Sequence, residues 1–223
     1  MTPTKGLPRH NDSPSSRAGL GGTVSHFRSK EKIYSQGMPA FTLFYIQSGG
    51  VRLTIQEKNQ PSAVTAILGV GDFFGELCLV GLPLRMSTAV ALTSSSIRVI
   101  KKDSMIRMLE KKNGKSMTFV SYLLNSIKKY QDHVAELLTS SAEQRLARVL
   151  LRLAHLDKGR ATVKAIPTLS DQVLAEMVGT TRSRINVFMN RFRKLGYIDY
   201  NGEIEVHKSL HKALLPGKNG KAA

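Results

Sequence analysis

The chain has 223 residues, of which 41% are hydrophobic, and its formal net charge at pH 7 is +17. Its single cysteine, Cys78, excludes an intrachain disulfide and a four-thiolate zinc or iron–sulfur site. No apolar run reaches the roughly 18 residues of a membrane-spanning helix, and the N-terminus lacks the apolar segment of a secretory signal. We therefore expect a cytoplasmic protein without a membrane partner.

The excess positive charge includes a marked surplus in the C-terminal part of the chain. Residues 140–223 carry 15 basic and 7 acidic side chains. Between Glu176 and Asp199 there are five basic side chains and no acidic one. Such a charge distribution attracts a polyanion, and nucleic acid is the usual one. A basic surface that is only solvated is the alternative.

The N-terminal part reads as a tail followed by a β-rich domain. Residues 1–24 are polar and rich in Ser, Pro and Gly, a composition that predicts a disordered tail. Residues 25–112 contain short strand-like segments that end in glycine or proline turns, typical of a β-roll made of two sheets or of a barrel. The clearest strand candidates are the segments 41–50, 51–61, 62–72 and 94–100. A short helix over 103–112, capped by Asp103, is expected at the end of this domain.

Residues 113–139 are predicted to form one long dimerisation helix. Mostly apolar side chains recur along it at alternating spacings of three and four residues, at Val120, Leu123, Ile127, Tyr130, Val134 and Leu137. This is the spacing of a coiled-coil seam, and it favours packing against the same helix of a second copy. A helix that is buried only against its own roll is the alternative.

Residues 140–212 carry the signals of a helix-turn-helix. Ser170 is placed to cap a first helix, and Thr180 or Thr181 is placed to cap a second one. Gly179, between the two helices, can adopt the left-handed backbone of a sharp turn. A capped helix, a glycine turn and a second capped helix are typical of this motif.

The outward face of the second helix is polar and basic. The side chains that we expect to contact DNA are Ser170, Thr180, Thr181, Arg182, Ser183, Arg184, Asn186, Val187 and Arg191. In a major groove, arginine can bind guanine through two hydrogen bonds and asparagine can bind adenine. The Asn201-Gly202 pair predicts a β-hairpin, which forms a wing when it follows a recognition helix. A helix pair with a purely structural role is the alternative.

Taken together, these segments resemble the Crp/Fnr family of bacterial transcription regulators over about residues 25–212. The resemblance rests on the loop FGEL with Arg85 nine residues after Glu76, on the long helix, and on LAEMVGTTRSRINVFMNRFRKLGYI. It implies an α+β fold with an N-terminal, jelly-roll-like β-roll of the cyclic-nucleotide-binding type, a long dimerisation helix and a C-terminal winged helix-turn-helix. It further implies a homodimer that binds a palindromic promoter site under the control of a small effector and contacts RNA polymerase.

The resemblance also implies an effector site in the roll. In cyclic-nucleotide-binding members, the residue matching Glu76 accepts a hydrogen bond from the ribose, and the one matching Arg85 pairs with the cyclic phosphate. The expected effector contacts are Gly75, Glu76, Leu77, Arg85, Met86, Ser87, Tyr130 and Gln131. No cofactor is required, and the candidate effectors are cyclic AMP, cyclic GMP and cyclic di-GMP.

Five positions depart from the family pattern. Met86 replaces the serine that follows the arginine in cyclic-AMP-activated members, and Tyr130-Gln131 replaces a Thr-Ser pair. Ser183 and Val187 stand where members commonly have glutamate and arginine, so a different DNA half-site is expected.

Two further hypotheses are an effector-independent regulator with a degenerate pocket and a cyclic-nucleotide-binding regulatory subunit of a partner protein. The second of these needs the roll but not the winged domain. Residues 213–223 are expected to form a basic flexible tail. The sequence shows no nucleophile–base set, metal-ligand spacing or phosphate-binding loop of an NTPase, so neither an enzyme nor a metal site is expected.

Overall fold

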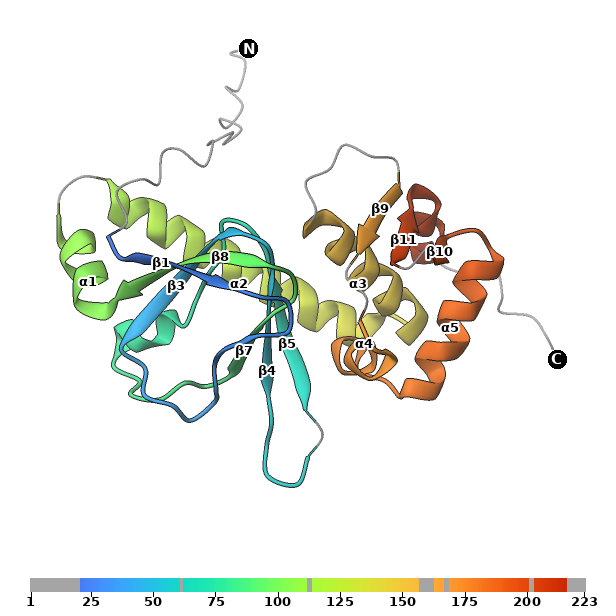
Figure 1. Cartoon of the computed structure of the whole chain (residues 1–223), viewed down its shortest axis with the longest axis horizontal. Coiled ribbons are helices and arrows are strands. Elements are labelled where there is room, and N and C mark those ends of the chain that lie inside the picture. The colour runs from blue at the N-terminus through green and yellow to red at the C-terminus, as the bar shows by residue number, and fades with distance from the viewer. Residues whose placement is uncertain are drawn as a thin grey trace, which may run out of the picture.

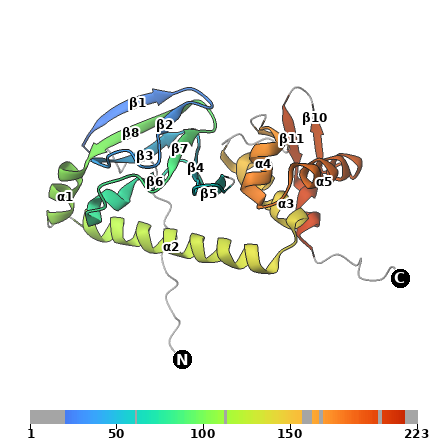
Figure 2. The same ribbon diagram turned by 90° about the horizontal axis from the view of Figure 1, so that it is seen from below.

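The computed structural model describes residues 21–60, 62–111, 114–156, 163–166, 169–200 and 203–215. Expectations for residues 1–20, for the Asn201-Gly202 turn and for residues 216–223 lie outside the described residues. Figure 1 shows a β-rich N-terminal part and a helix-rich C-terminal part, and Figure 2 shows one long helix that runs beneath the first and reaches the second. The α+β architecture predicted from the sequence is confirmed.

The N-terminal part is a β-roll of two antiparallel sheets, with strand orders β1-β8-β3-β6 and β2-β7-β4-β5. The strands are β1 (Thr23–Phe27), β2 (Lys32–Tyr34), β3 (Thr42–Ser48), β4 (Val51–Ile55), β5 (Ala63–Leu68), β6 (Phe73–Phe74), β7 (Thr88–Ala91) and β8 (Ser95–Lys101). The four strand candidates coincide with β3, β4, β5 and β8. β1 starts inside the predicted tail, so the expected boundary at residue 24 was slightly late.

Both faces of β3 are buried, because the strand lies between two apolar clusters. Phe44 and Ile46 face the second sheet, whereas Leu43 and Tyr45 belong to the cluster that the following helices cover. This accounts for the continuous apolar sequence of β3. A strand with one solvated face would instead alternate apolar and polar residues.

A 3₁₀-helix, η2 (Glu76–Val80), and a short helix, α1 (Lys102–Glu110), complete the roll. The predicted helix is present, but Asp103 as its N-cap was wrong. β8 runs directly into α1, so Lys101 occupies the N-cap position, and the Lys102 N–H donates to the carbonyl of Phe41 at 3.0 Å. Asp103 lies in the first turn, where its negative charge interacts favourably with the helix dipole.

The long helix is α2 (Lys115–Thr139), and one of its faces packs against the roll. Phe119 is buried there, and Tyr122 and Leu123 pack against the same apolar cluster. The Tyr122 hydroxyl accepts a hydrogen bond from the Phe73 N–H at 2.8 Å and donates one to the Phe73 carbonyl at 3.0 Å. The end of β6 is thereby attached to the middle of α2.

The C-terminal part is a three-helix domain with a small antiparallel sheet of order β10-β11-β9. Its elements are α3 (Ala142–Leu156), β9 (Val163–Ile166), α4 (Asp171–Val178), α5 (Arg182–Lys194), β10 (Ile198–Tyr200), β11 (Ile204–His207) and η3 (Lys208–Leu214). Leu146, Leu150, Leu174, Ile185 and Phe192 are fully buried in one core. η3 includes the first two residues of the predicted C-terminal tail, Ala213 and Leu214.

The capping signals of the helix-turn-helix are confirmed. The Ser170 hydroxyl accepts from the Val173 N–H at 3.3 Å, and the Thr181 hydroxyl accepts from the Arg184 N–H at 3.4 Å. Gly179 is left-handed, with φ of 67°. β10 and β11 pair in antiparallel register, as a wing requires.

Candidate functional site

The effector loop joins β6 to β7 and is organised around one buried cation. The Arg85 side chain is only 6% exposed, and its guanidinium donates to the Thr42 hydroxyl at 2.8 Å and to the Gly75 carbonyl at 3.3 Å. Gly75 has φ of 74°, and a Cβ atom at this position would lie 2.5 Å from Nη1 of Arg85. Glycine is therefore required both by the left-handed backbone and by the close approach of the guanidinium.

An aromatic platform lies under this guanidinium. The central carbon of Arg85 is 4.4 Å from the centre of the Tyr34 ring and 5.1 Å from that of Phe44. Phe74 stacks on Phe44 with 4.8 Å between ring centres. Such cation–π contacts hold a desolvated guanidinium without neutralising its charge. Tyr34 and Thr42 were missed from the sequence, because an aromatic or hydroxyl residue in a strand gives no signal of its distant partner.

The two charged groups of the loop differ in burial, with Arg85 buried and Glu76 half-buried. Burial raises the pKa of the Glu76 carboxyl and lowers the pKa of the Arg85 guanidinium. Neither side chain forms an ion pair with another described residue, and the buried Nε of Arg85 has no hydrogen-bond partner among them. A ligand that carries both an anionic group and a hydroxyl group would satisfy this loop.

Met86 and Ser87, which follow the arginine, lie on different sides of the loop. Met86 is 57% exposed, so the structure does not bring it into the group around Arg85. Ser87 is half-buried and forms a hydrogen bond with Tyr34. Burial raises the pKa of the Tyr34 phenol, and the hydrogen bond from Ser87 lowers it by a smaller amount. The nearby charges of Arg85 and Glu76 act on the same phenol. Ser87 thus belongs to the cluster, whereas Met86 and the exposed Leu77 do not.

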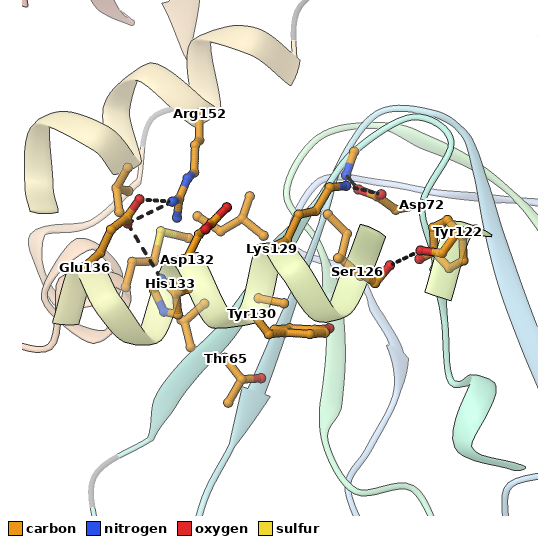
Figure 3. A pocket seen from close by; sticks show the side chains of 17 residues that line it. Thr65, Asp72, Tyr122, Ser126, Lys129, Tyr130, Asp132, His133, Glu136 and Arg152 are labelled. Carbon is orange, nitrogen blue, oxygen red and sulfur yellow. Dashed lines mark hydrogen bonds and ion pairs between the residues drawn. The ribbon is translucent and has the colours of Figure 1, made fainter. Parts of the chain in front are cut away.

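A cavity of about 480 Å³ lies beside this loop, between the roll, α2 and the C-terminal domain. Figure 3 shows Thr65 of β5 and Tyr130 of α2 on one side of it, and Arg152 of α3 above α2. Val149 and Met177 complete the wall from the C-terminal domain. Among the expected effector contacts, Tyr130 is the one that lines this cavity.

Ion pairs connect α2 to both domains at the two ends of the cavity (Figure 3). Lys129 lies 2.9 Å from the Asp72 carboxylate of the roll. The Arg152 guanidinium of α3 donates to both oxygens of Glu136, at 2.7 and 2.8 Å. These four residues were not expected from the sequence, because surface charges give no indication of which partner they will meet.

Tyr130 and Gln131 are neighbours in the chain but lie on different sides of α2. Burial raises the pKa of the Tyr130 phenol, with smaller contributions from the negative charges of Glu76 and Asp72, so this ring lies near the effector loop. Gln131 is exposed, between Ile127 and Val134. The expected effector site is therefore divided, with Tyr130 beside it and Gln131 turned away.

The exposed side of α2 carries an apolar row, which we call the α2 stripe. Its members are Met117, Val120, Leu124, Ile127, Val134 and Leu138, with Gln131 as the single polar position. The spacings alternate between three and four residues throughout. Of the predicted seam, Leu123 packs against the roll, whereas Tyr130 and Leu137 are exposed and Tyr130 also lines the cavity.

The other candidate surface is α5, which Figure 1 shows at the outer edge of the C-terminal domain. The inner face of α5 is buried and carries Ile185, Met189 and Phe192. The expected DNA contacts of α5 are exposed, namely Arg182, Ser183, Arg184, Asn186, Val187 and Arg191, as are the flanking Ser170 and Thr181, whereas Thr180 is half-buried.

Two of these side chains have partners within the domain. Nη1 of Arg191 lies 3.1 Å from the Glu143 carboxylate, so this guanidinium already forms an ion pair within the protein. The Asn186 side-chain oxygen accepts a hydrogen bond from Asn190 at 3.0 Å. Arg191 is therefore less available to DNA than the sequence suggested.

Comparison with known proteins identifies both halves of the chain. The family model "Cyclic nucleotide-binding domain" matches residues 24–112, and the model "Crp-like helix-turn-helix domain" matches residues 144–209. The chain belongs to the Crp/Fnr family. This Crp/Fnr protein is a DNA-binding transcription regulator and not an enzyme.

Individual relatives of this Crp/Fnr regulator are distant. It is 24% identical over 174 residues to a "CRP-like cAMP-activated global transcriptional regulator" of Mycobacterium tuberculosis (strain ATCC 25618 / H37Rv), and the match covers 77% of each chain. FixK2 from Bradyrhizobium japonicum has the same fold, with a TM-score of 0.75, 21% identity, and coverage of 89% of this chain and 100% of that one. The c-di-GMP-responsive regulator CLP of Xanthomonas campestris has a TM-score of 0.66 at 18% identity, covering 83% and 93%.

No helix among the described residues is long and apolar enough to cross a membrane. No three His, Cys, Asp or Glu side chains in the same ranges are grouped so that they could hold a metal ion.

Proposed function

We propose that this Crp/Fnr regulator is a homodimer whose binding to a palindromic promoter site is controlled by a nucleotide-like effector in the roll. The observation that carries the proposal is the pair of charged groups in the effector loop, the buried Arg85 guanidinium and the half-buried Glu76 carboxyl. A cyclic nucleotide offers a phosphate to the first and a sugar hydroxyl to the second.

The candidate effectors are cyclic AMP, cyclic GMP and cyclic di-GMP. The mycobacterial relative is described as cAMP-activated, and CLP as responsive to c-di-GMP. The exposed position of Met86 supports a phosphate ligand, because the residue that replaces the family serine does not fill the space beside Arg85. Ser87 and Tyr34 supply hydroxyl groups on the inner side of the loop.

The α2 stripe supports a homodimer, because an exposed apolar row with heptad spacing fits a second copy of the same helix. A two-fold dimer places two recognition helices at the two halves of a palindromic site. Contact with RNA polymerase is part of the proposal, since a bound regulator changes transcription through that enzyme.

An effector-independent regulator is the second candidate, and one observation favours it. The Arg85 guanidinium already contacts Tyr34, Phe44 and Thr42, which hold it without a ligand. In that case the loop would be a structural remnant, and the promoter would be bound equally well in every condition.

The two candidates are separated by measuring thermal unfolding with each cyclic nucleotide in turn. A ligand at about one hundred times its Kd stabilises the folded protein by about 3 kcal/mol. Arg85→Ala should abolish this shift, and the matched control Met86→Ala should retain it. A shift that survives Arg85→Ala would refute the loop as the phosphate site, and no shift with any nucleotide would favour the effector-independent regulator.

DNA binding is tested by fluorescence anisotropy with the promoter of the protein's own gene and a shuffled duplex of equal length. The double variant Arg182→Ala/Arg184→Ala should lose the preference for the promoter, whereas Arg107→Ala, an exposed arginine on α1, should keep it. Equal affinity of the wild-type protein for both duplexes, with and without nucleotides, would refute the proposal.

A further inference from the structure

An exposed valine in the middle of the recognition helix has no structural role in its own domain. Val187 is 63% exposed and takes no part in the apolar core that the described residues form. That core holds α5 through Ile185, Met189 and Phe192, which lie on the opposite face.

Local structure does not favour valine at this position either. A β-branched side chain loses rotamer freedom in a helix, so lysine, glutamate or alanine would stabilise a solvated helical position better. An apolar residue that neither packs inside the domain nor favours its own helix is more consistent with a contact outside the domain.

The neighbouring asparagine limits what else this part of α5 can read. Asn186 accepts a hydrogen bond from the side chain of Asn190, so one of the two lone pairs of its carboxamide oxygen is occupied. Recognition of adenine through two hydrogen bonds needs this oxygen to accept from the adenine amino group. In this conformation a single lone pair of Asn186 is left for a base.

Arg184 has a neighbour on the same helix as well. The central carbon of its guanidinium lies 5.8 Å from the centre of the Phe188 ring. Val187 lies next to Asn186 and one turn after the polar Ser183, and it is the exposed aliphatic side chain of α5 (Arg182–Lys194).

In the major groove, the feature of a base pair that an aliphatic side chain can read is the 5-methyl group of thymine. We propose that Val187 contacts this methyl group and thereby specifies one T·A base pair in each half-site. The inference rests on the proposed function, because it requires α5 to lie in the major groove of a two-fold site.

The test begins with selection of a binding site from a random duplex library by the full-length dimer. Each thymine of the selected site is then replaced by deoxyuridine, which removes the methyl group and leaves the Watson–Crick pair unchanged. At the one thymine that Val187 contacts, this replacement should weaken binding about fourfold for each half-site, because one buried methyl contact is lost. A site in which 5-methylcytosine·G replaces that T·A pair should be bound more tightly than a site in which unmethylated C·G replaces it.

Two variants make the result specific. Val187→Ala shortens the aliphatic side chain at an exposed position, and it should clearly lower the ratio of the affinities for the thymine and deoxyuridine sites. Lys194→Ala, at the exposed end of α5, serves as the control and should keep the ratio of the two affinities. Circular dichroism of both variants checks that the helix is intact.

The outcomes separate the inference from the proposed function. If wild-type protein binds thymine and deoxyuridine sites equally at every position, or if Val187→Ala retains the deoxyuridine penalty, the inference is overturned. If the library enriches no sequence at all, the proposed function fails, and the inference fails with it.

Discussion

Tyr122 and Phe73 are joined by two hydrogen bonds, in which the hydroxyl of the first accepts from the backbone N–H of the second and donates to its carbonyl. Phe73 lies three residues before Glu76, so this contact attaches the effector loop directly to α2. The Phe73 ring also packs edge-on against Phe119 and Tyr122.

Replacing Tyr122 by phenylalanine removes both hydrogen bonds and keeps the ring. Two backbone groups of Phe73 then lose their partner, and such loss costs about 1–3 kcal/mol for each buried group. We expect a clear decrease in the free energy of unfolding, measured by urea denaturation. A variant as stable as the wild type would show that water replaces the hydroxyl without cost.

The same tyrosine predicts a change of stability at alkaline pH. Burial raises the pKa of Tyr122 from 10.0 to about 12, so the phenol contributes its full stabilisation below pH 10 and loses it as the pH rises to about 12. The upper limit of this loss is about 3 kcal/mol. The stability difference between wild type and Tyr122→Phe should therefore shrink over this range, and a constant difference would contradict the assignment.

Gly75→Ala should disturb the effector loop, and Gly81 provides a matched control. Both glycines have positive φ, 74° and 87°, but a Cβ atom at Gly75 would meet Arg85, whereas one at Gly81 would meet nothing within 4 Å. Gly81→Ala should cost only the backbone term of about 1–2 kcal/mol. Gly75→Ala should cost more and also displace the guanidinium, which thermal unfolding and nucleotide binding can measure. Equal effects of the two changes would contradict the close approach.

Glu136→Gln should weaken the connection between α2 and α3. It removes the charge that pairs with Arg152, whereas Asp132→Asn removes only an exposed pair with Lys128. We expect a loss of about 1 kcal/mol for the first variant and less than about 0.5 kcal/mol for the second, because exposed pairs contribute little. Chemical denaturation measures both, and the opposite order would refute a specific role for Glu136.

Leu124→Glu should separate the proposed dimer. A charge in the middle of an apolar seam is costly to bury, whereas Asn125→Glu adds the same charge at an exposed position next to the α2 stripe. Sedimentation velocity should give a monomer for the first variant and a dimer for the second. A dimeric Leu124→Glu would show that copies associate through another surface.

Local signals in the sequence were sufficient for the caps and turns. Ser170, Gly179 and Thr181 act through groups within a few residues, so their roles follow from residue type and spacing. Asp103 was an exception, because β8 continues directly into α1 and the Phe41 carbonyl, distant in sequence, accepts from the first helical N–H.

The α2 seam shows why periodicity alone could not settle which residues face outward. Leu123 and Leu124 both fit a spacing of three or four from Val120, and Leu137 and Leu138 both fit from Val134. The roll decides between Leu123 and Leu124, because Phe119, Tyr122 and Leu123 are the residues of α2 that meet its apolar cluster. The aromatic platform under Arg85 was missed for a similar reason, since Tyr34 approaches the arginine only after the sheets have formed.

Lys129 and Glu136 anchor α2 to the roll and to the C-terminal domain from positions seven residues apart. Seven residues are about two helical turns, so the two anchors face nearly the same direction and are separated by about 10 Å along the axis. A short helical segment of this kind is stiff in torsion. Tyr130 lies between the two anchors, so the roll and the C-terminal domain are both fixed to the stretch of α2 that lines the cavity.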